Sequence, residues 1–535
     1  MKKLLLPTIL SSVFLIASPG ALGHEDEPIP SGAPDRLGDV VFPISCSTAA
    51  QEEFNRALAM LHSFFYPEAG KTFSRSTEID PSCAMGHWGV AMSWWYPLWF
   101  PPTKESLQQG KAALEKAIAL GAPTERERAY IAALENFYGD FDKLDHKLRS
   151  LAYEKAMAQV HQQYPNDREA AAFYALALQS TANPNDKTYA NQLKSAEILE
   201  TLFAEQPNHP GVAHYLIHAY DYPELAARAL PAARRYGAIA PTMPHALHMP
   251  SHTYIAVGLW QESIESNLAA GDAARKLGWA QEELHTMDYL VYAYLQSARS
   301  GIAKEVLQKL AKVNIAESAR TLVFDYAKAA APARFALEQR RWDDAAALSP
   351  LPSRFPATMA LTYFARALGA AHLGKIENAE AEVAQLTQLR DTLLQSKQDY
   401  WAKQVDIQRE AAFAWVSWAK GNGAQAIERM RSAVALEEST YKHPAAPGWL
   451  LPARELLGDL LMASDLPNQA LVEYEASLRT NPNRFNSLYG AAHSAEVTGM
   501  ASKAAAHYRQ LLEISKTADG ERTDLRHATL FLMSN

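Results

Sequence analysis

Residues 451–484, LPARELLGDLLMASDLPNQALVEYEASLRTNPNR, contain the pattern that decides the fold. The stretch combines three small residues, one aromatic residue and a late proline, namely Gly458, Ala470, Ser477, Tyr474 and Pro482. Small residues let two helices cross closely, and an aromatic ring fills the gap beside them. A proline cannot continue the second helix. The stretch therefore predicts one pair of antiparallel helices.

The same spacing recurs in other parts of the chain. The matching positions are Ala492, Ala504 and Tyr508 one period later, Ala57, Ala69, Phe73, Ser76 and Pro81 near the N-terminus, and Ala414, Ala426 and Ala433 between them. Matches in one frame at both ends of the chain indicate an internal repeat, and no convincing strand pattern interrupts the helical periodicity. We therefore expect an all-α solenoid of about eleven to twelve helix pairs.

This pattern resembles the tetratricopeptide (TPR) superfamily over most of the chain, with a more divergent middle. The resemblance implies antiparallel helix pairs that stack into a superhelix with a concave groove. Proline-rich breaks occur near 350–356 and 443–452. We expect them to divide the array into an N-terminal superhelix over 46–350, with a histidine-lined groove, and C-terminal repeats over 351–535.

The N-terminus has the features of a secretory signal over residues 1–23. Lys2 and Lys3 precede a short apolar run, and Ala21 and Gly23 suit a signal peptidase. The alternatives are an uncleaved membrane anchor or a lipoprotein signal. We expect a periplasmic or secreted protein without a membrane span after cleavage, beginning with a flexible leader over 24–45 that is rich in proline, glycine and charge.

Charge and cysteine content bear on the binding partners and on the compartment of the protein. The formal net charge is −8, and no basic face suggests a nucleic-acid partner. Cys46 and Cys83 are the two cysteines, and an oxidising compartment favours a disulfide between them. Two free thiols remain an alternative. A cysteine metal site is a weaker one, because the two residues lie 37 positions apart without a CxxC motif.

Histidines cluster in the middle of the chain at helical spacings. The six are His214, His218, His245, His248, His252 and His285. Spacings of three, four and seven residues place each set on one face of its helix, and Asp221 and Asp288 continue two of these faces. When the repeat pattern is extended to this region, all eight residues fall on the first helices of three successive helix pairs. Their positions are those that line the groove in the superfamily.

These eight residues are the predicted metal ligands, or the groups that orient them. Neighbouring helix axes lie about 8–10 Å apart, so imidazoles from adjacent helices can share an ion. Imidazole with carboxylate support suits copper, zinc or iron, not calcium or magnesium. The pattern leaves open one or two metals. It also leaves open a groove lined by imidazole and aromatic groups for a ligand, or a buried polar network.

Pro250 interrupts the middle one of these helices. An interior proline bends a helix, which would rotate His248 and His252 relative to His245 and make His245 the weakest ligand candidate. Alternatively, the helix begins at Pro250.

Three motifs also resemble a group of exported bacterial TPR proteins. The motifs are HxxxH at 214–218, PHAxHMPSH at 244–252 and HxxDY at 285–289. Cys46 and the stretch 83–89 fit the same group. The resemblance implies the architecture and brings no settled activity.

The function predicted from the sequence is transition-metal binding in the groove of an exported solenoid, which leaves open whether the protein is an enzyme. A metallopeptidase is excluded, because Tyr215 stands where that chemistry needs a glutamate. In an enzyme, Tyr254, Tyr289 or Tyr292 would lie near the metal. The alternative function is a scaffold that binds a protein or peptide partner in the same groove, without a metal.

Overall fold

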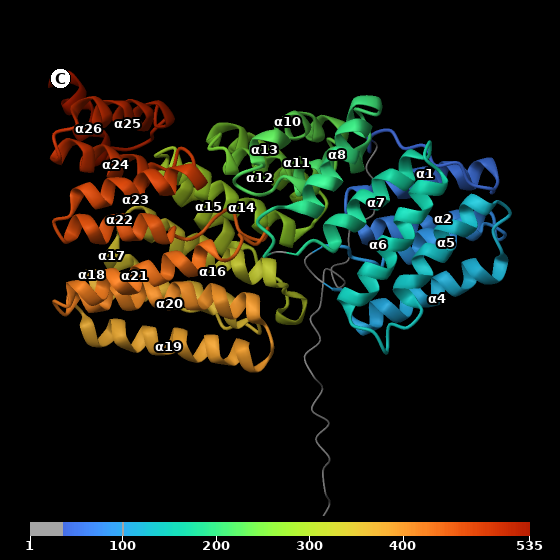
Figure 1. Cartoon of the computed structure of the whole chain (residues 1–535), viewed down its shortest axis with the longest axis horizontal. Helices are drawn as coiled ribbons and strands as arrows, with labels where there is room; N and C mark the ends of the chain where they lie inside the picture. The colour runs from blue at the N-terminus through green and yellow to red at the C-terminus, as the bar shows by residue number, and fades with distance from the viewer. Residues whose placement is uncertain (1–35, 99–100, 184, 535) are drawn as a thin grey trace, which may run out of the picture.

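The computed structural model describes residues 36–98, 101–183 and 185–534. Within them the chain forms helices and no strand, and consecutive helices pack as antiparallel pairs (Figure 1). The predicted signal over 1–23 and residues 24–35 of the predicted leader lie outside the described residues. Across the described part, no helix has the length and apolarity that a membrane span requires.

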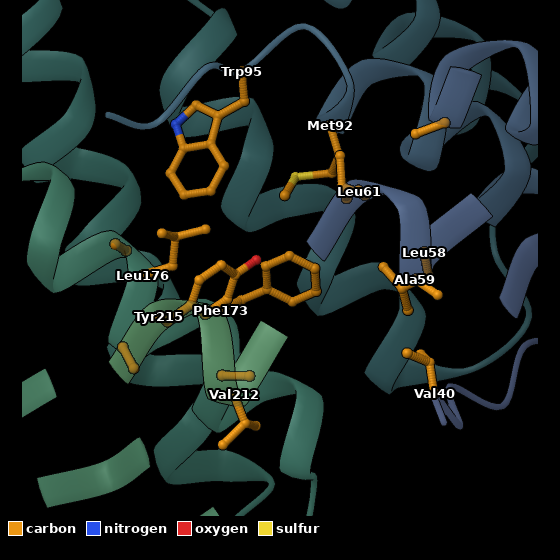
Figure 2. Packing of buried hydrophobic residues seen from close by; sticks show 14 of the residues in the cluster. Val40, Leu58, Ala59, Leu61, Met92, Trp95, Phe173, Leu176, Val212 and Tyr215 are labelled. Atoms are coloured by element: carbon orange, nitrogen blue, oxygen red, sulfur yellow. The ribbon is translucent and has the colours of Figure 1, made fainter. Parts of the chain in front are cut away.

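The first eight helices form one lobe of the molecule (Figure 1). They are α1 (Thr48–His62), α2 (Tyr66–Ile79), α3 (Ala84–Met92), α4 (Lys104–Leu120), α5 (Glu125–Tyr138), α6 (His146–Gln163), α7 (Arg168–Ser180) and α8 (Ala190–Glu205). Figure 2 shows the centre of this lobe, where Met92, Trp95, Phe173 and Tyr215 pack together from α3, the segment after it, α7 and α9.

The middle of the chain connects this lobe to the C-terminal one. Its helices are α9 (Pro210–Ala219), the 3-10 turn η1 (Ala226–Ala229), α10 (Leu230–Ile239), α11 (Pro244–His248), α12 (Pro250–Ala256), α13 (Trp260–Lys276), α14 (Ala280–Gln296) and α15 (Ser300–Lys312). The first helices of these repeats, α9, α11 with α12, and α14, are the ones that the sequence predicted to carry the histidines.

The C-terminal lobe continues the same arrangement. It contains η2 (Glu317–Ala319), α16 (Leu322–Glu338), α17 (Trp342–Ala346), α18 (Pro356–His372), α19 (Ile376–Gln395), α20 (Asp399–Ala419), α21 (Gly423–Glu438), α22 (Ala453–Ala463), α23 (Pro467–Thr480), α24 (Phe485–Val497), α25 (Ala501–Ile514) and α26 (Thr523–Ser534). Helix α16 packs on α18 across 350–356. The buried hydrophobic residues of the described part form clusters over Leu37–Trp279, Ile255–Ala331 and Ala298–Ala528.

Small and aromatic residues meet within a helix pair, as Gly458 and Tyr474 do, and between consecutive pairs, as Gly89 of α3 and Phe73 of α2 do. A Cβ atom on Gly458 would lie 2.7 Å from the ring of Tyr474, and one on Gly89 would lie 2.2 Å from the ring of Phe73. Twelve pairs form among the described residues when α11 and α12 count as one helix, and α26 follows them. The predicted all-α, TPR-like solenoid is therefore confirmed.

The segment before α1 is held against the first lobe. Phe42 is fully buried, with its ring 5.4 Å from that of Phe54 and 5.8 Å from that of Trp88. Residues 36–45 of the predicted flexible leader are therefore packed against the lobe, through the buried side chains of Leu37, Val40 and Phe42. Next along the chain, Cys46 and Cys83 form the predicted disulfide, which ties the start of α1 to the start of α3.

Candidate metal centre

The six clustered histidines form two groups of three. We call His214, His218 and His245 the first triad, and His248, His252 and His285 the second triad. Within each triad, one ring nitrogen from each residue lies within 4.8 Å of those from the other two. The rings of His245 and His248 are 6.4 Å apart between centroids, so the two triads are neighbours.

The break at Pro250 does not coincide with the division into triads, because His245 and His248 lie on the same helix α11 and join different triads. Helix α11 ends at His248 and α12 begins at Pro250, while Met249 between them keeps helical dihedral angles. Both interpretations of Pro250 therefore hold in part. His245 points back toward α9 and joins the first triad, whereas His248 and His252 join His285 of α14.

Burial favours the neutral form of five of the six imidazoles. His214 and His248 are fully buried, and His218, His252 and His285 are at most 8% exposed. Burial lowers the pKa of His248 to about 3, lowers that of His252, and holds those of His214, His218 and His285 well below the usual value. Neutral imidazole is the form that binds a metal.

The tautomers in the second triad follow from its hydrogen bonds. Nδ1 of His248 lies 2.7 Å from Oδ1 of Asn267, whose amide nitrogen donates to the Ser263 carbonyl at 2.8 Å. Nδ1 of His252 lies 3.0 Å from Oδ2 of Asp221. Both acceptors lack a proton to give, so each Nδ1 donates. In a neutral ring, the Nε2 atom then carries only a lone pair.

Two such lone pairs face each other in the second triad. Nε2 of His248 and Nε2 of His252 lie 3.1 Å apart. The Tyr289 hydroxyl lies 3.2 Å from His252 Nε2 but closer, at 2.8 Å, to the carbonyl of Pro444, to which it donates. No proton holds the two imidazoles together, whereas a bound cation would.

The first triad also brings three ring nitrogens together, and here the hydrogen bond of His214 fixes its tautomer. Nδ1 of His214 donates to the backbone carbonyl of His62 at 2.7 Å, which leaves a lone pair on its Nε2. That Nε2 lies 2.9 Å from Nε2 of His218 and 3.2 Å from Nε2 of His245. His245 Nδ1 lies 3.6 Å from a carboxylate oxygen of Glu282. Three ring nitrogens therefore converge on one point here too.

The two predicted aspartates have different surroundings. Asp221 orients His252 and lies 3.8 Å from the ammonium group of Lys442. Asp288 belongs to neither triad, because its carboxylate faces Arg334, with Oδ1 3.5 Å from Nε. Burial raises the pKa of Asp288 to about 6, against the opposing effect of Arg334.

Residues 440–452, which we call the strap, cross from the C-terminal lobe to the triads. Tyr289 donates to the Pro444 carbonyl, and Arg334 donates to the carbonyls of Gly448 and Trp449. The sequence indicated only a proline-rich break here. Because the strap contacts α14 through its own backbone carbonyls, its side chains gave no signal of this contact.

Two pockets beside the strap reach the triads. One, of about 420 Å³, is lined by His252 of the second triad, and the other, of about 470 Å³, is lined by His218 of the first. Asp221, Tyr441 and Lys442 line both pockets. Both volumes are typical of small-molecule sites.

A third buried cluster was missed by sequence reasoning. His62, Glu169 and His209 come from distant parts of the chain and meet with their ligand atoms within 4.8 Å of each other. His209 Nδ1 accepts the Val212 amide at 3.2 Å, so its Nε2 carries the proton that bonds Glu169 at 2.9 Å. With that tautomer fixed, His209 has no lone pair to give a metal. Helical spacing cannot reveal the cluster, because each residue sits on a different helix or cap.

Comparisons with known proteins leave the family open. No family model and no curated protein matches the chain. Among the solved structures that match, the human IFIT1 dimer with m7Gppp-AAAA is 10% identical with a TM-score of 0.36, over 81% of this chain and 90% of that one. Naa15/Naa10 bound to HypK-THB is 12% identical with a TM-score of 0.23, over 91% and 72%. Such likeness concerns the helical fold alone.

Proposed function

We propose that this solenoid binds two transition-metal ions, one in each histidine triad. The observation that carries the proposal is the pair of Nε2 atoms of His248 and His252, 3.1 Å apart with both Nδ1 protons engaged elsewhere. Buried polar atoms normally have a partner, and here a metal ion is the partner that the chemistry supplies. Oriented Nδ1 groups are also the usual support of metal-bound imidazoles.

The ligand set favours copper, zinc or iron. Each triad offers three imidazole groups, which suit these ions and not calcium or magnesium. Three protein ligands leave a coordination position for a further group, the arrangement found in catalytic rather than structural zinc sites. In this proposal, small molecules reach the open coordination positions through the pockets lined by His218 and His252. We therefore propose a metalloenzyme-like centre with accessible metal ions.

We further propose that the protein is exported, as in the bacterial TPR group that its motifs resemble. The disulfide between Cys46 and Cys83 supports an oxidising compartment. Mass spectrometry of the protein from its native host tests this. A mature chain that begins near residue 24 supports export, and a chain that retains Met1 in the cytosol contradicts it.

Metal counting tests the proposed function. Protein without a histidine tag is stripped with a chelator, loaded with Zn²⁺ or Cu²⁺, dialysed and weighed by native mass spectrometry. We expect two ions in the wild type, one in each of His218→Ala and His252→Ala, and none bound tightly in the double variant. Metal-free wild type after loading would remove the proposal and leave the groove as a protein or peptide site.

A further inference from the structure

Glu169 on α7 lies between two buried histidines beside the first triad. Its Oε2 accepts from Nε2 of His62 at 3.0 Å, and its Oε1 accepts from Nε2 of His209 at 2.9 Å. The three side chains are at most 4% exposed. With its Nε2 proton given to Glu169, His62 uses Nδ1 to accept the Tyr215 hydroxyl at 2.8 Å. The ring of His62 is thus held on both sides.

The backbone of the same histidine supports the first triad. His62 is the last residue of α1, where the carbonyl groups of a helix have no partner inside the helix. Its carbonyl oxygen instead accepts the Nδ1 proton of His214 at 2.7 Å. This one bond decides that the Nε2 of His214, which faces His218 and His245, carries the lone pair.

We propose that Glu169 is a positioning residue for the first metal site. By fixing the ring of His62, it fixes the His62 carbonyl and through it the tautomer and direction of His214. The inference rests on the proposed function, since it assigns a support to one of the two proposed metal sites.

This support belongs to one triad only. The second triad takes its orientation from Asn267 and Asp221, which belong to α13 and to the turn after α9. No hydrogen bond of Glu169 reaches them. A change at Glu169 therefore acts on one ion and leaves the other as an internal reference.

The test is the variant Glu169→Gln in the full chain, titrated with Co²⁺, whose visible absorption reports its coordination. We expect two sites in the wild type. In the variant, the affinity of one site falls roughly tenfold to hundredfold with a changed spectrum, while the other keeps its affinity and spectrum. Glu127→Gln is the matched control, because Glu127 is a buried carboxylate in the same lobe that bonds Ser45 and Thr124 instead. It should leave both sites unchanged.

A second variant keeps the inference testable if the Glu169→Gln protein does not fold. Tyr215→Phe removes the other hydrogen bond of the His62 ring at nearly constant volume, and it should weaken the same site in the same direction by a smaller factor. Two unchanged sites in a folded Glu169→Gln protein, or in Tyr215→Phe, would overturn the inference alone. A wild type that binds no Co²⁺ would instead overturn the proposed function.

Discussion

The two triads differ in the groups that accept hydrogen bonds from the Nδ1 atoms of their histidines. In the first triad, His214 is oriented by a backbone carbonyl; in the second, His252 is oriented by the carboxylate of Asp221. A carboxylate behind a ligating imidazole raises its basicity and fixes its tautomer. We therefore expect the second site to be the tighter of the two.

Asp221→Asn tests the role of this carboxylate. We expect the affinity of the second site to fall roughly tenfold to hundredfold, because the charge behind His252 is lost and the amide can turn its nitrogen toward Nδ1. Isothermal titration with Zn²⁺ measures the change. Asp272→Asn on the exposed face of α13 serves as the control. Equal affinities for Asp221→Asn and wild type would show that Asp221 does not support a ligand.

His372 makes the stability of the C-terminal lobe depend on pH. Its ring stacks on that of Trp342, with centroids 3.8 Å apart, and lies tilted against that of Trp415 at 4.1 Å, and burial lowers its pKa to about 4. This lies below the value of about 6.5 for an unfolded chain. The unfolded state therefore binds more protons, and the contribution is complete above pH 6.5 and declines as the pH falls toward 4.

His372→Phe removes this titration and keeps the stack. Between pH 7 and pH 5, we expect the wild type to lose about 2 kcal/mol more unfolding free energy than the variant. Urea unfolding followed by tryptophan fluorescence at both pH values measures the difference. A variant that loses as much stability as the wild type would contradict this assignment.

At the scale of the helix, close contact between glycine and tyrosine sets the distance within a pair. The ring of Tyr474 occupies the space where a Cβ atom on Gly458 or Gly490 would lie. One aromatic residue thus packs against the first helix of its own pair and against that of the next. This is why the repeat pattern could be predicted from its small and aromatic positions.

Gly458→Val should therefore destabilise the C-terminal repeats. The added atoms must displace the Tyr474 ring, which we expect to cost about 1–3 kcal/mol. Thermal unfolding measures the effect. The control is Gly423→Ala at the start of α21, where an added Cβ meets nothing within 4 Å. A fully stable Gly458→Val protein would show that this contact does not fix the spacing.

The histidines of α11 and α12 mark the limit of prediction at this scale. The heptad-like spacing placed His245, His248 and His252 on one face, but it could not assign them to separate triads. That assignment depends on the neighbouring helix that each ring of α11 meets, which is α9 with His214 for His245 and α14 with His285 for His248. His245, the weakest candidate in the sequence, lies 3.2 Å from His214.

At the scale of the whole molecule, the repeat pattern predicted which helices are neighbours along the array. It did not predict contacts between helices that are far apart in the sequence. It identified the three helices that carry the histidines, because adjacent repeats stack in order. It could not identify the contact of His62 with Glu169, or of the strap with Tyr289, since 107 and 155 residues separate these partners. Such contacts depend on how the superhelix curves, which no local pattern encodes.

The disulfide is the covalent link of the first lobe. Its two cysteines are 37 residues apart, and closing a loop of that length stabilises the fold by about 4 kcal/mol in the chain-entropy account. The variant Cys46→Ser with Cys83→Ser should lose about that much free energy of unfolding in urea. Its metal count should stay at two, because neither cysteine contacts a triad. Equal urea midpoints for variant and wild type would contradict this role.

Anomalous X-ray diffraction from crystals of the zinc-loaded wild type tests the central claim most directly. Data collected on both sides of the zinc absorption edge locate each ion independently of the protein model. We predict two anomalous peaks, one among His214, His218 and His245 and one among His248, His252 and His285. Fully loaded crystals with no peak at either triad, or with zinc only at surface residues, would contradict the account.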